Sequence, residues 1–172
     1  MKTSLFAGFA GLLTAAYALP ALSQEAVLGA ANADALFTSP DPKLHANKQV
    51  VYHIVKDLLE ANRWELADRY IDKDYVQHNP NARNGRDAVV YFFTQILKVQ
   101  PTPIPEKLGL PVAEVMADGD LVTVIYPRRV IDPKHPKGSY STAWFDTWRI
   151  RNGKAVEHWD PALMNEAPKL SN

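Results

Sequence analysis

The sequence contains no cysteine, which excludes disulfide bridges, thiolate nucleophiles and zinc–thiolate sites. It has no excess of charge either: Lys+Arg and Asp+Glu both number 19, and no basic run stands out. Neither a nucleic acid nor an anionic membrane is therefore expected as a partner. At 172 residues with 47% hydrophobic residues, the chain is long enough for one well-filled core and too short for two ordinary domains.

A long hydrophobic run is also lacking, because residues 5–18 are fewer than the ~20 that a membrane span needs and Pro20 follows them. This run follows Lys2 and leads to small residues that end at Ser23. That order is typical of a cleaved secretory signal. We therefore expect residues 1–23 to be a signal peptide, the mature protein to be exported to the periplasm or secreted, and no membrane attachment after cleavage.

The first half of the remaining chain has helical periodicity. Residues 24–43 are Ala-rich and aperiodic, which indicates a flexible leader before a domain over residues 44–165, with residues 166–172 as a tail. Apolar residues spaced three and four apart predict three helices. The first begins near residue 44, the second and shorter one covers about residues 64–71 as its antiparallel partner, and the third covers residues 86–98. The stretch between the last two is expected to be irregular or briefly extended.

The second half changes to β-branched runs separated by turns. These runs predict strands over residues 112–116, 121–131, 139–151 and 154–160. Helices that precede strands indicate an α+β fold with an antiparallel meander, rather than an alternating parallel fold.

The register of the last hairpin decides which polar side chains share a face. A two-residue turn at Asn152–Gly153 would place Asp146 opposite Trp159. A three-residue loop with a bulge would instead place Asp146 opposite His158. We prefer the three-residue loop, because it gathers the apolar residues on one buried face together with this Asp/His pair.

The preferred register yields a candidate acid–base site. Proton removal next to a carbonyl needs a base, a donor for the enolate oxygen and walls that exclude water. The candidate catalytic residues are Asp146, His158, His78 and Asp160. The candidate substrate-binding residues, which would form flat apolar walls, are Tyr75, Phe92, Tyr126, Trp144 and Trp148.

Other interpretations of these residues stay open. A buried Asp/His pair can simply tie two strands together, and tryptophans are more often core than ligand platform. Two His and two Asp could coordinate a metal ion, but no closely spaced His motif supports this, so no metal is expected. A serine hydrolase is not expected, since Ser141 lacks a Gly-x-Ser-x-Gly context.

Residues 72–80, the helix start at 84–86 and above all residues 145–160 resemble the SnoaL-like polyketide cyclase family of the nuclear-transport-factor-2-like superfamily. The resemblance covers about residues 44–163. It implies a cone-shaped, curved antiparallel sheet wrapped around three N-terminal helices with an internal pocket. It also implies that no cofactor is needed, with Asp146 as general base, His158 as its partner, His78 as a carbonyl-polarising donor at the rim and Asp160 at the strand end.

The resemblance predicts a lyase or isomerase, such as an aldol-type cyclase or a dehydratase, acting on a small hydrophobic carbonyl compound. Because relatives on this fold also include binding and scaffolding proteins, the alternatives are an exported binding protein without turnover and a dimeric interaction module. Phe145 and Trp159, which are expected on the outer face of the sheet, suggest a homodimer through that face.

Overall fold

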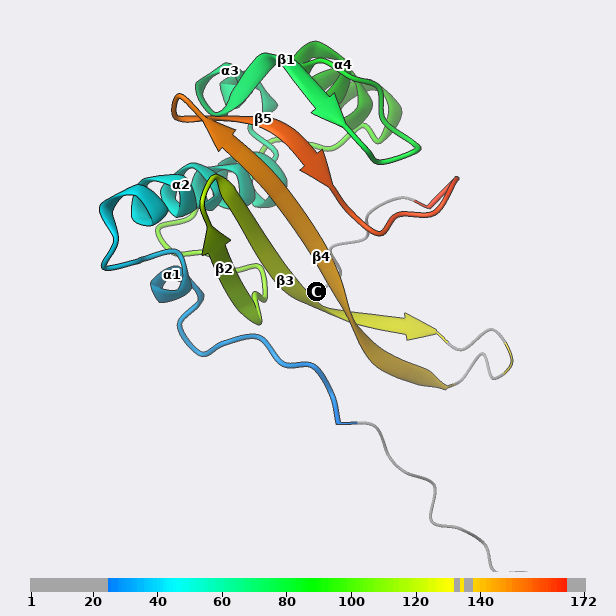
Figure 1. The fold of residues 1–172 in the computed structure, drawn as a ribbon. Coiled ribbons are helices and arrows are strands. Elements are labelled where there is room, and N and C mark those ends of the chain that lie inside the picture. Colours follow the sequence, from blue (N-terminus) through cyan, green and yellow to red (C-terminus); the bar gives the residue numbers. More distant parts are fainter. Residues whose placement is uncertain (1–24, 132–133, 135–137, 167–172) are drawn as a thin grey trace, which may run out of the picture.

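A computed structural model describes residues 25–131, 134 and 138–166 (Figure 1). The predicted signal peptide lies outside the described residues, as does nearly all of the predicted tail. Within the described part of the chain, no helix has both the length and the apolar character that a membrane span requires.

Three helical segments of the predicted domain lie where the periodicity places them. Helix α2 covers Pro42–His53 and continues as the π-helix η1, Ile54–Glu60. It begins at Asp41, whose carboxylate accepts the backbone N–H groups of Lys43 and Leu44, with proline in the first turn. The second segment is the 3₁₀ turn η2, Trp64–Leu66, followed by α3, Ala67–Tyr70; the third is α4, Arg86–Tyr91, continued by the π-helix η3, Phe92–Ile96.

The sheet is a curved, open layer of five strands in the order β1-β5-β4-β3-β2 (Figure 1). The strands are β1 Ile71–Gln77, β2 Glu114–Asp118, β3 Leu121–Ile131, β4 Ser139–Arg151 and β5 Lys154–Trp159. Helix α2 packs against β2, β3, β4 and β5, while α4 packs against β1. The fold is therefore α+β, as predicted, and the sheet curves around its helices.

The predicted sheet is wrong in one respect, because it is not antiparallel throughout. The segment expected to be irregular forms β1, which pairs in parallel with β5: Val76 lies opposite Glu157 and Gln77 opposite His158. A break in register between Ile71 and Val76 accompanies this pairing. The parallel strand brings the end of β1 beside the polar residues of β5.

Both registers considered for the last hairpin are wrong over part of its length. The turn has two residues, Asn152 and Gly153, both with positive φ as a type I′ turn requires, and Ile150 pairs with Ala155. Val156 is then an extra residue, so that Trp148 pairs with His158. The bulge lets Ala155 and His158 both face inward, although they are three residues apart.

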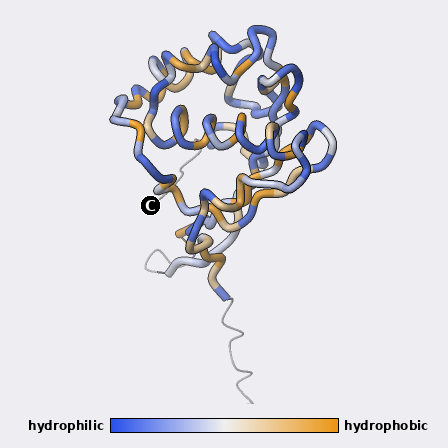
Figure 2. The backbone as a smooth tube through the Cα atoms, turned by 90° about the vertical axis from the view of Figure 1, so that its left-hand side faces the viewer, coloured by the Kyte–Doolittle hydropathy of each residue, from blue (hydrophilic) through white to orange (hydrophobic). Residues whose placement is uncertain are grey.

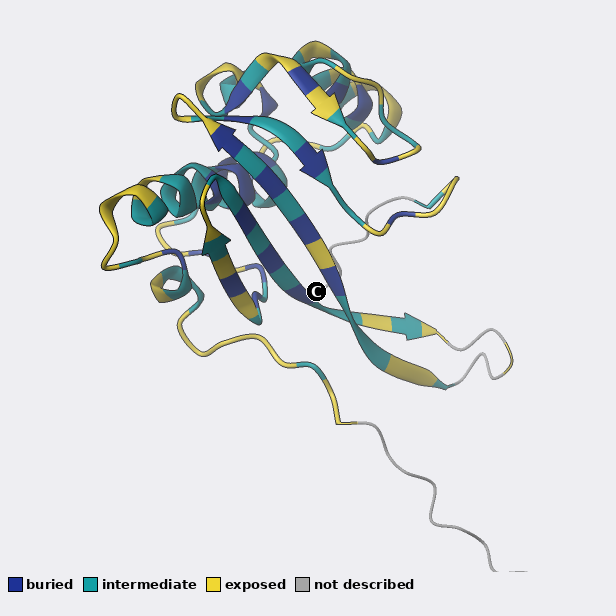
Figure 3. Ribbon diagram, viewed as in Figure 1, coloured by how far each residue is buried: buried dark blue, intermediate teal, exposed yellow. Residues whose placement is uncertain are grey.

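The core lies between the helices and the concave side of the sheet. Buried and more exposed positions alternate along β3 and β4 (Figure 3), as expected when one face of a sheet is covered. Hydrophobic positions are likewise interspersed with hydrophilic ones along the tube (Figure 2). Helices α2 and α4 both pass from α to π geometry at their C-terminal ends.

The predicted leader is packed on the domain over most of its described length. It contains the short helix α1, Ala33–Leu36, and Phe37 is fully buried against the ring of Tyr52. The Ala30 N–H donates to the Val112 carbonyl, and the Val27 N–H donates to Ser141 Oγ. The aperiodic composition hid these contacts because they depend on one aromatic anchor and on backbone groups.

Candidate active site

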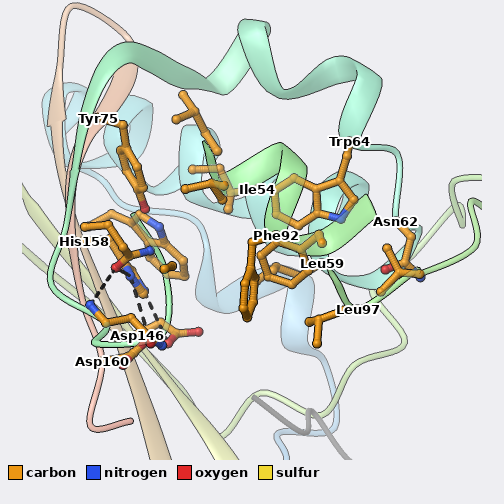
Figure 4. A pocket seen from close by; sticks show the side chains of 18 residues that line it. Ile54, Leu59, Asn62, Trp64, Tyr75, Phe92, Leu97, Asp146, His158 and Asp160 are labelled. Atoms are coloured by element: carbon orange, nitrogen blue, oxygen red, sulfur yellow. Dashed lines mark hydrogen bonds and ion pairs between the residues drawn. The ribbon is translucent and has the colours of Figure 1, made fainter. Parts of the chain in front are cut away.

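A cavity of about 460 Å³ lies between the helices and the inner side of the sheet. This volume is within the range of small-molecule sites in proteins. The two ends of the cavity differ (Figure 4): Asp146, His158 and Asp160 gather at one end, and apolar side chains with Asn62 form the other. The apolar wall comes from η1, η2, α4, η3 and the connection after η3, and consists of Ile54, Leu59, Trp64, Val89, Phe92, Phe93, Leu97 and Val99.

The centre of the polar end is the contact between Asp146 on β4 and His158 on β5. His158 Nε2 lies 3.4 Å from Asp146 Oδ1, and both side chains are about nine-tenths buried. The Trp144 indole N–H donates to the same Oδ1 at 2.7 Å. The two residues are diagonal neighbours across the strands, because the direct partner of His158 is Trp148. The ring of Trp148 lies 5.1 Å from that of His158.

The other ring nitrogen of His158 defines the tautomer. His158 Nδ1 lies 2.8 Å from Gln77 Oε1, which also accepts the backbone N–H of Asn79 at 3.0 Å. A backbone N–H can only donate, so the shared atom is the amide oxygen and Nδ1 must carry the proton. In the neutral ring, Nε2 therefore presents its lone pair toward Asp146. A hydrogen bond between Nε2 and Oδ1 then requires one shared proton.

Asp160 is held as an acceptor at the end of β5. Its Oδ2 accepts the side-chain N–H of Asn79 at 2.7 Å and its Oδ1 accepts the Ala162 N–H at 2.9 Å. The Asn79 amide is oriented in turn, because its Oδ1 accepts the Asn81 N–H at 2.8 Å. Both oxygens of Asp160 are thereby fixed in position.

Tyr75 on β1 closes the polar end from the side of the parallel strand. Its ring is nearly parallel to that of His158, with the centroids 6.5 Å apart. Burial raises the pKa of the Tyr75 hydroxyl well above its ordinary value, although a hydrogen bond from Trp148 opposes the shift. The phenol therefore remains protonated at neutral pH and can donate.

The structure brings together most of the predicted site. Asp146, His158, Asp160, Tyr75, Phe92 and Trp148 all line the cavity. Trp144 and Tyr126 are buried beside the site but do not line it: Trp144 orients Asp146, and the hydroxyl of Tyr126 has no hydrogen-bond partner among the described residues. Burial and the nearby Asp146 charge raise the pKa of Tyr126 well above its ordinary value.

His78, expected at the rim of the pocket, does not line the cavity. Its Nε2 lies 2.9 Å from Glu157 Oε1, its ring stacks on Trp159, and 44% of its side chain is exposed. Because side chains alternate along β1, Tyr75 and Gln77 face inward while Val76 and His78 face outward. The hydrogen bond from His78 holds the pKa of Glu157 below its ordinary value. His78 therefore belongs to a surface cluster.

Two functional side chains were missed, Gln77 and Asn79. Both line the cavity and contact His158 or Asp160 directly. The period of two counted from the aromatic Tyr75 would have pointed to both. The turn-forming residues that follow Gln77 predict an irregular segment, and this hides the strand alternation.

Asp146, His158 and Asp160 could also hold a metal ion, since one ligand atom from each lies within 4.8 Å of the others. The Gln77 contact would orient the histidine in such a site, as carbonyl oxygens do for metal-bound imidazoles. The same hydrogen bonds serve an acid–base pair equally well. The polar end is thus a compact acid–base group set against an aromatic wall.

The fold and the cavity together define the class: an α+β protein whose curved sheet and helices enclose a cavity of the size of a small-molecule site. The profile of the SnoaL-like domain family matches residues 51–158. The chain belongs to this family, as its resemblance predicted. The match includes both inward-facing residues of the dyad, Asp146 and His158.

Comparison with other proteins adds the following similarities. No curated protein sequence matches the chain. A candidate polyketide cyclase from Acidithiobacillus ferrooxidans is 14% identical with a TM-score of 0.49, over 72% of this chain and 89% of that one. An NTF2-like protein of unknown function from Burkholderia pseudomallei is 19% identical (TM-score 0.48, 67% and 88% covered). A candidate SnoaL-like polyketide cyclase from Shewanella denitrificans is 16% identical (TM-score 0.47, 66% and 88% covered).

Proposed function

We propose that the protein is a cofactor-independent lyase or isomerase that removes a proton alpha to a carbonyl of a small hydrophobic molecule. The observation that carries this proposal is the buried contact of 3.4 Å between His158 Nε2 and Asp146 Oδ1 at the polar end of a largely apolar cavity. Proton removal next to a carbonyl needs a base and walls that exclude water, and this end of the cavity provides a proton acceptor beside aromatic side chains. The cyclase names of similar solved structures point in the same direction.

The roles in this reaction follow from the hydrogen bonds. The Asp146 carboxylate takes the α-proton, and the electron pair of the C–H bond moves to the carbonyl oxygen as an enolate. His158 Nε2 receives the proton from Asp146 and returns it to the product or to a leaving hydroxyl group. Gln77 fixes the ring through Nδ1.

The Gln77 amide takes the role first expected of His78. Its oxygen is held by His158 and Asn79, and no hydrogen bond is formed by its Nε2 within the described residues. The N–H groups are therefore available to the carbonyl oxygen of a substrate in the cavity that Gln77 lines. A donor aimed at developing oxygen charge is the second element of enolate chemistry.

Solvent exchange tests this proposal without knowledge of the natural substrate. The methyl protons of 2-acetylnaphthalene, which lie alpha to its carbonyl, should exchange with D₂O faster in the presence of the protein than in buffer. Asp146→Asn should lower that acceleration by about 10²–10⁴-fold, the usual contribution of a positioned general base. Asp87→Asn, a change at an exposed carboxylate on α4, is the matched control.

The second candidate is a binding protein without turnover, which the enclosed cavity alone would support. It predicts that 2-acetylnaphthalene binds and that its exchange rate stays at the buffer value. That result would overturn the catalytic proposal.

Export and self-association are further parts of the proposal. Export rests on the pattern of residues 1–23 and would be tested by intact-mass analysis of the protein from its host, expected to begin at Gln24. A homodimer through the outer sheet face rests on the exposed side chain of Phe145 on β4 and on Trp159 of β5, which pairs with Thr147. Phe145→Glu should shift the mass measured by light scattering from dimer to monomer.

A further inference from the structure

The charges around the cavity are all of one sign, apart from one imidazole. Asp146 and Asp160 are the charged side chains at the polar end, with His158 between them. Within the described part of the chain, no lysine or arginine lines the cavity. With His158 protonated the site carries one net negative charge, and with His158 neutral it carries up to two.

Two arginines of the central strands β3 and β4 have partners outside the cavity. Arg128 lies over the ring of Trp144 and pairs with Glu166, while Arg149 pairs with Asp120 and Glu157. Neither one lines the cavity. An anionic ligand would therefore enter a buried site with two carboxylates and no free cation to pair with it. Like charges in such surroundings repel strongly, because little water screens them.

The polar end is instead equipped to accept hydrogen bonds from a ligand. Asp160 has both oxygens fixed by Asn79 and Ala162, and each carboxylate oxygen can accept more than one hydrogen bond. The available donors are the Gln77 amide and the Tyr75 hydroxyl, both uncharged. A hydroxyl, an ammonium group or a neutral carbonyl is complemented here, whereas a carboxylate is not.

The aromatic wall of the cavity favours a flat ligand. The Trp64 and Phe93 rings are stacked with centroids 4.0 Å apart, and Phe92 meets Phe93 edge to face at 5.3 Å. All three line the cavity, and Trp64 lies at the end away from Asp146 (Figure 4). The cavity is about three times the ~150 Å³ that suffices for one benzene ring. Two or three fused rings fit this space.

We propose that the cavity takes uncharged or cationic molecules with two or three flat rings, and excludes carboxylates and other anions of the same shape. This inference rests on the proposed function only in taking the same cavity as the substrate site. It narrows the substrate to ketones or similar neutral carbonyl compounds that carry no acidic group. Products with a free carboxylate would be rejected by the same charges.

Three probes that share one ring system test this inference by calorimetric titration at pH 7: 2-acetylnaphthalene, 1-(2-naphthyl)ethylamine and 2-naphthoate. The ketone and the amine should bind, and the carboxylate should bind on the order of a hundredfold more weakly than the ketone. Binding of naphthoate as tight as that of the ketone would overturn the inference. Binding of neither ketone nor amine would overturn it as well.

Asp160→Asn removes the charge and keeps the shape, although the amide oxygen can accept only one of the two hydrogen bonds that Asp160 receives from Asn79 and Ala162. It should raise naphthoate affinity on the order of tenfold while leaving the ketone affinity within about threefold. Asp87→Asn should change neither affinity, and a uniform loss of all three affinities in Asp160→Asn would contradict the charge argument. These titrations do not require turnover. Binding in the predicted order without proton exchange of 2-acetylnaphthalene would overturn the catalytic proposal alone. Proton exchange together with tight binding of 2-naphthoate would overturn this inference alone.

Discussion

His158 Nε2 lies 3.4 Å from Asp146 Oδ1, although the strand partner of His158 is Trp148. The contact is diagonal, and the extra residue Val156 makes it so by shifting β5 one place along β4. A regular hairpin with the same two-residue turn would have put Asp146 opposite Trp159. The bulge therefore determines which side chain the carboxylate meets.

The first prediction separates a catalytic dyad from a structural clasp. Asp146→Asn keeps an oxygen that can accept the Trp144 N–H, so its melting temperature should fall by less than about 4 °C. Asp146→Leu leaves that buried indole N–H without a partner, which should cost about 1–3 kcal/mol of the free energy of unfolding. Thermal and urea unfolding measure both variants. A large loss of stability in Asp146→Asn, with proton exchange intact, would favour the clasp.

The second prediction concerns the proton on the His158 ring. Gln77 Oε1 accepts hydrogen bonds from the Asn79 backbone N–H and from His158 Nδ1. Neutral His158 should therefore carry its proton on Nδ1 and none on Nε2. The ¹⁵N shifts of the imidazole distinguish the two tautomers. In Gln77→Leu the acceptor is gone, so the Nδ1-protonated population should fall markedly. An Nε2-protonated ring in the unmodified protein would remove Gln77 from its positioning role.

Much of the fold and of the site could be predicted from the sequence. The parts that could not be predicted have a common cause. Periodicity located the three helices and the four later strands because each has a one-sided apolar pattern. The parallel pairing of β1 leaves no local signal, since its partner β5 lies some eighty residues away. Gln77 and Asn79 depended on that pairing, and so did the outward position of His78.

The bulge in the β4–β5 hairpin is a second feature that the sequence does not predict. Asn152–Gly153 specifies the turn, but nothing in Lys154–Trp159 marks Val156 as the bulged residue. The prediction that Asp146 and His158 would meet is nevertheless confirmed, for a different geometric reason. Both face inward, and an imidazole is long enough to reach a diagonal neighbour.

The third prediction is that His78 is dispensable for chemistry. His78→Gln should leave the proton exchange rate and the probe affinities unchanged, since the ring stacks on Trp159 outside the cavity. Loss of the half-exposed contact with Glu157 should cost less than about 1 kcal/mol of the free energy of unfolding. Exchange assays and urea unfolding of this variant check both statements. A hundredfold lower proton exchange rate in His78→Gln would show that His78 takes part in the chemistry.

The fourth prediction is a loss of stability in alkali. Burial and the hydrogen bond to Asp57 raise the pKa of Tyr70 to about 12, whereas an unfolded tyrosine has a pKa of about 10. The folded state therefore keeps this proton longer. Its contribution to the free energy of unfolding is constant below pH 10 and is lost as the pH rises from about 10 to 12. Urea unfolding across this range should show a shallower slope in Tyr70→Phe, and an unchanged slope in Tyr140→Phe, at an exposed position.

The last prediction tests whether the segment before α2 belongs to the folded unit. Phe37 is fully buried against Tyr52, and backbone carbonyls beside it accept from Lys48 and Gln49 of α2. Burial lowers the pKa of Lys48, consistent with a covered amine. Phe37→Ala should therefore cost about 3–5 kcal/mol of the free energy of unfolding, as for other buried phenylalanines. Leu28→Ala, at a position 75% exposed in the same segment, should change it by less than about 0.5 kcal/mol. Urea unfolding of both variants decides the matter, because a free leader would make the two substitutions equally harmless.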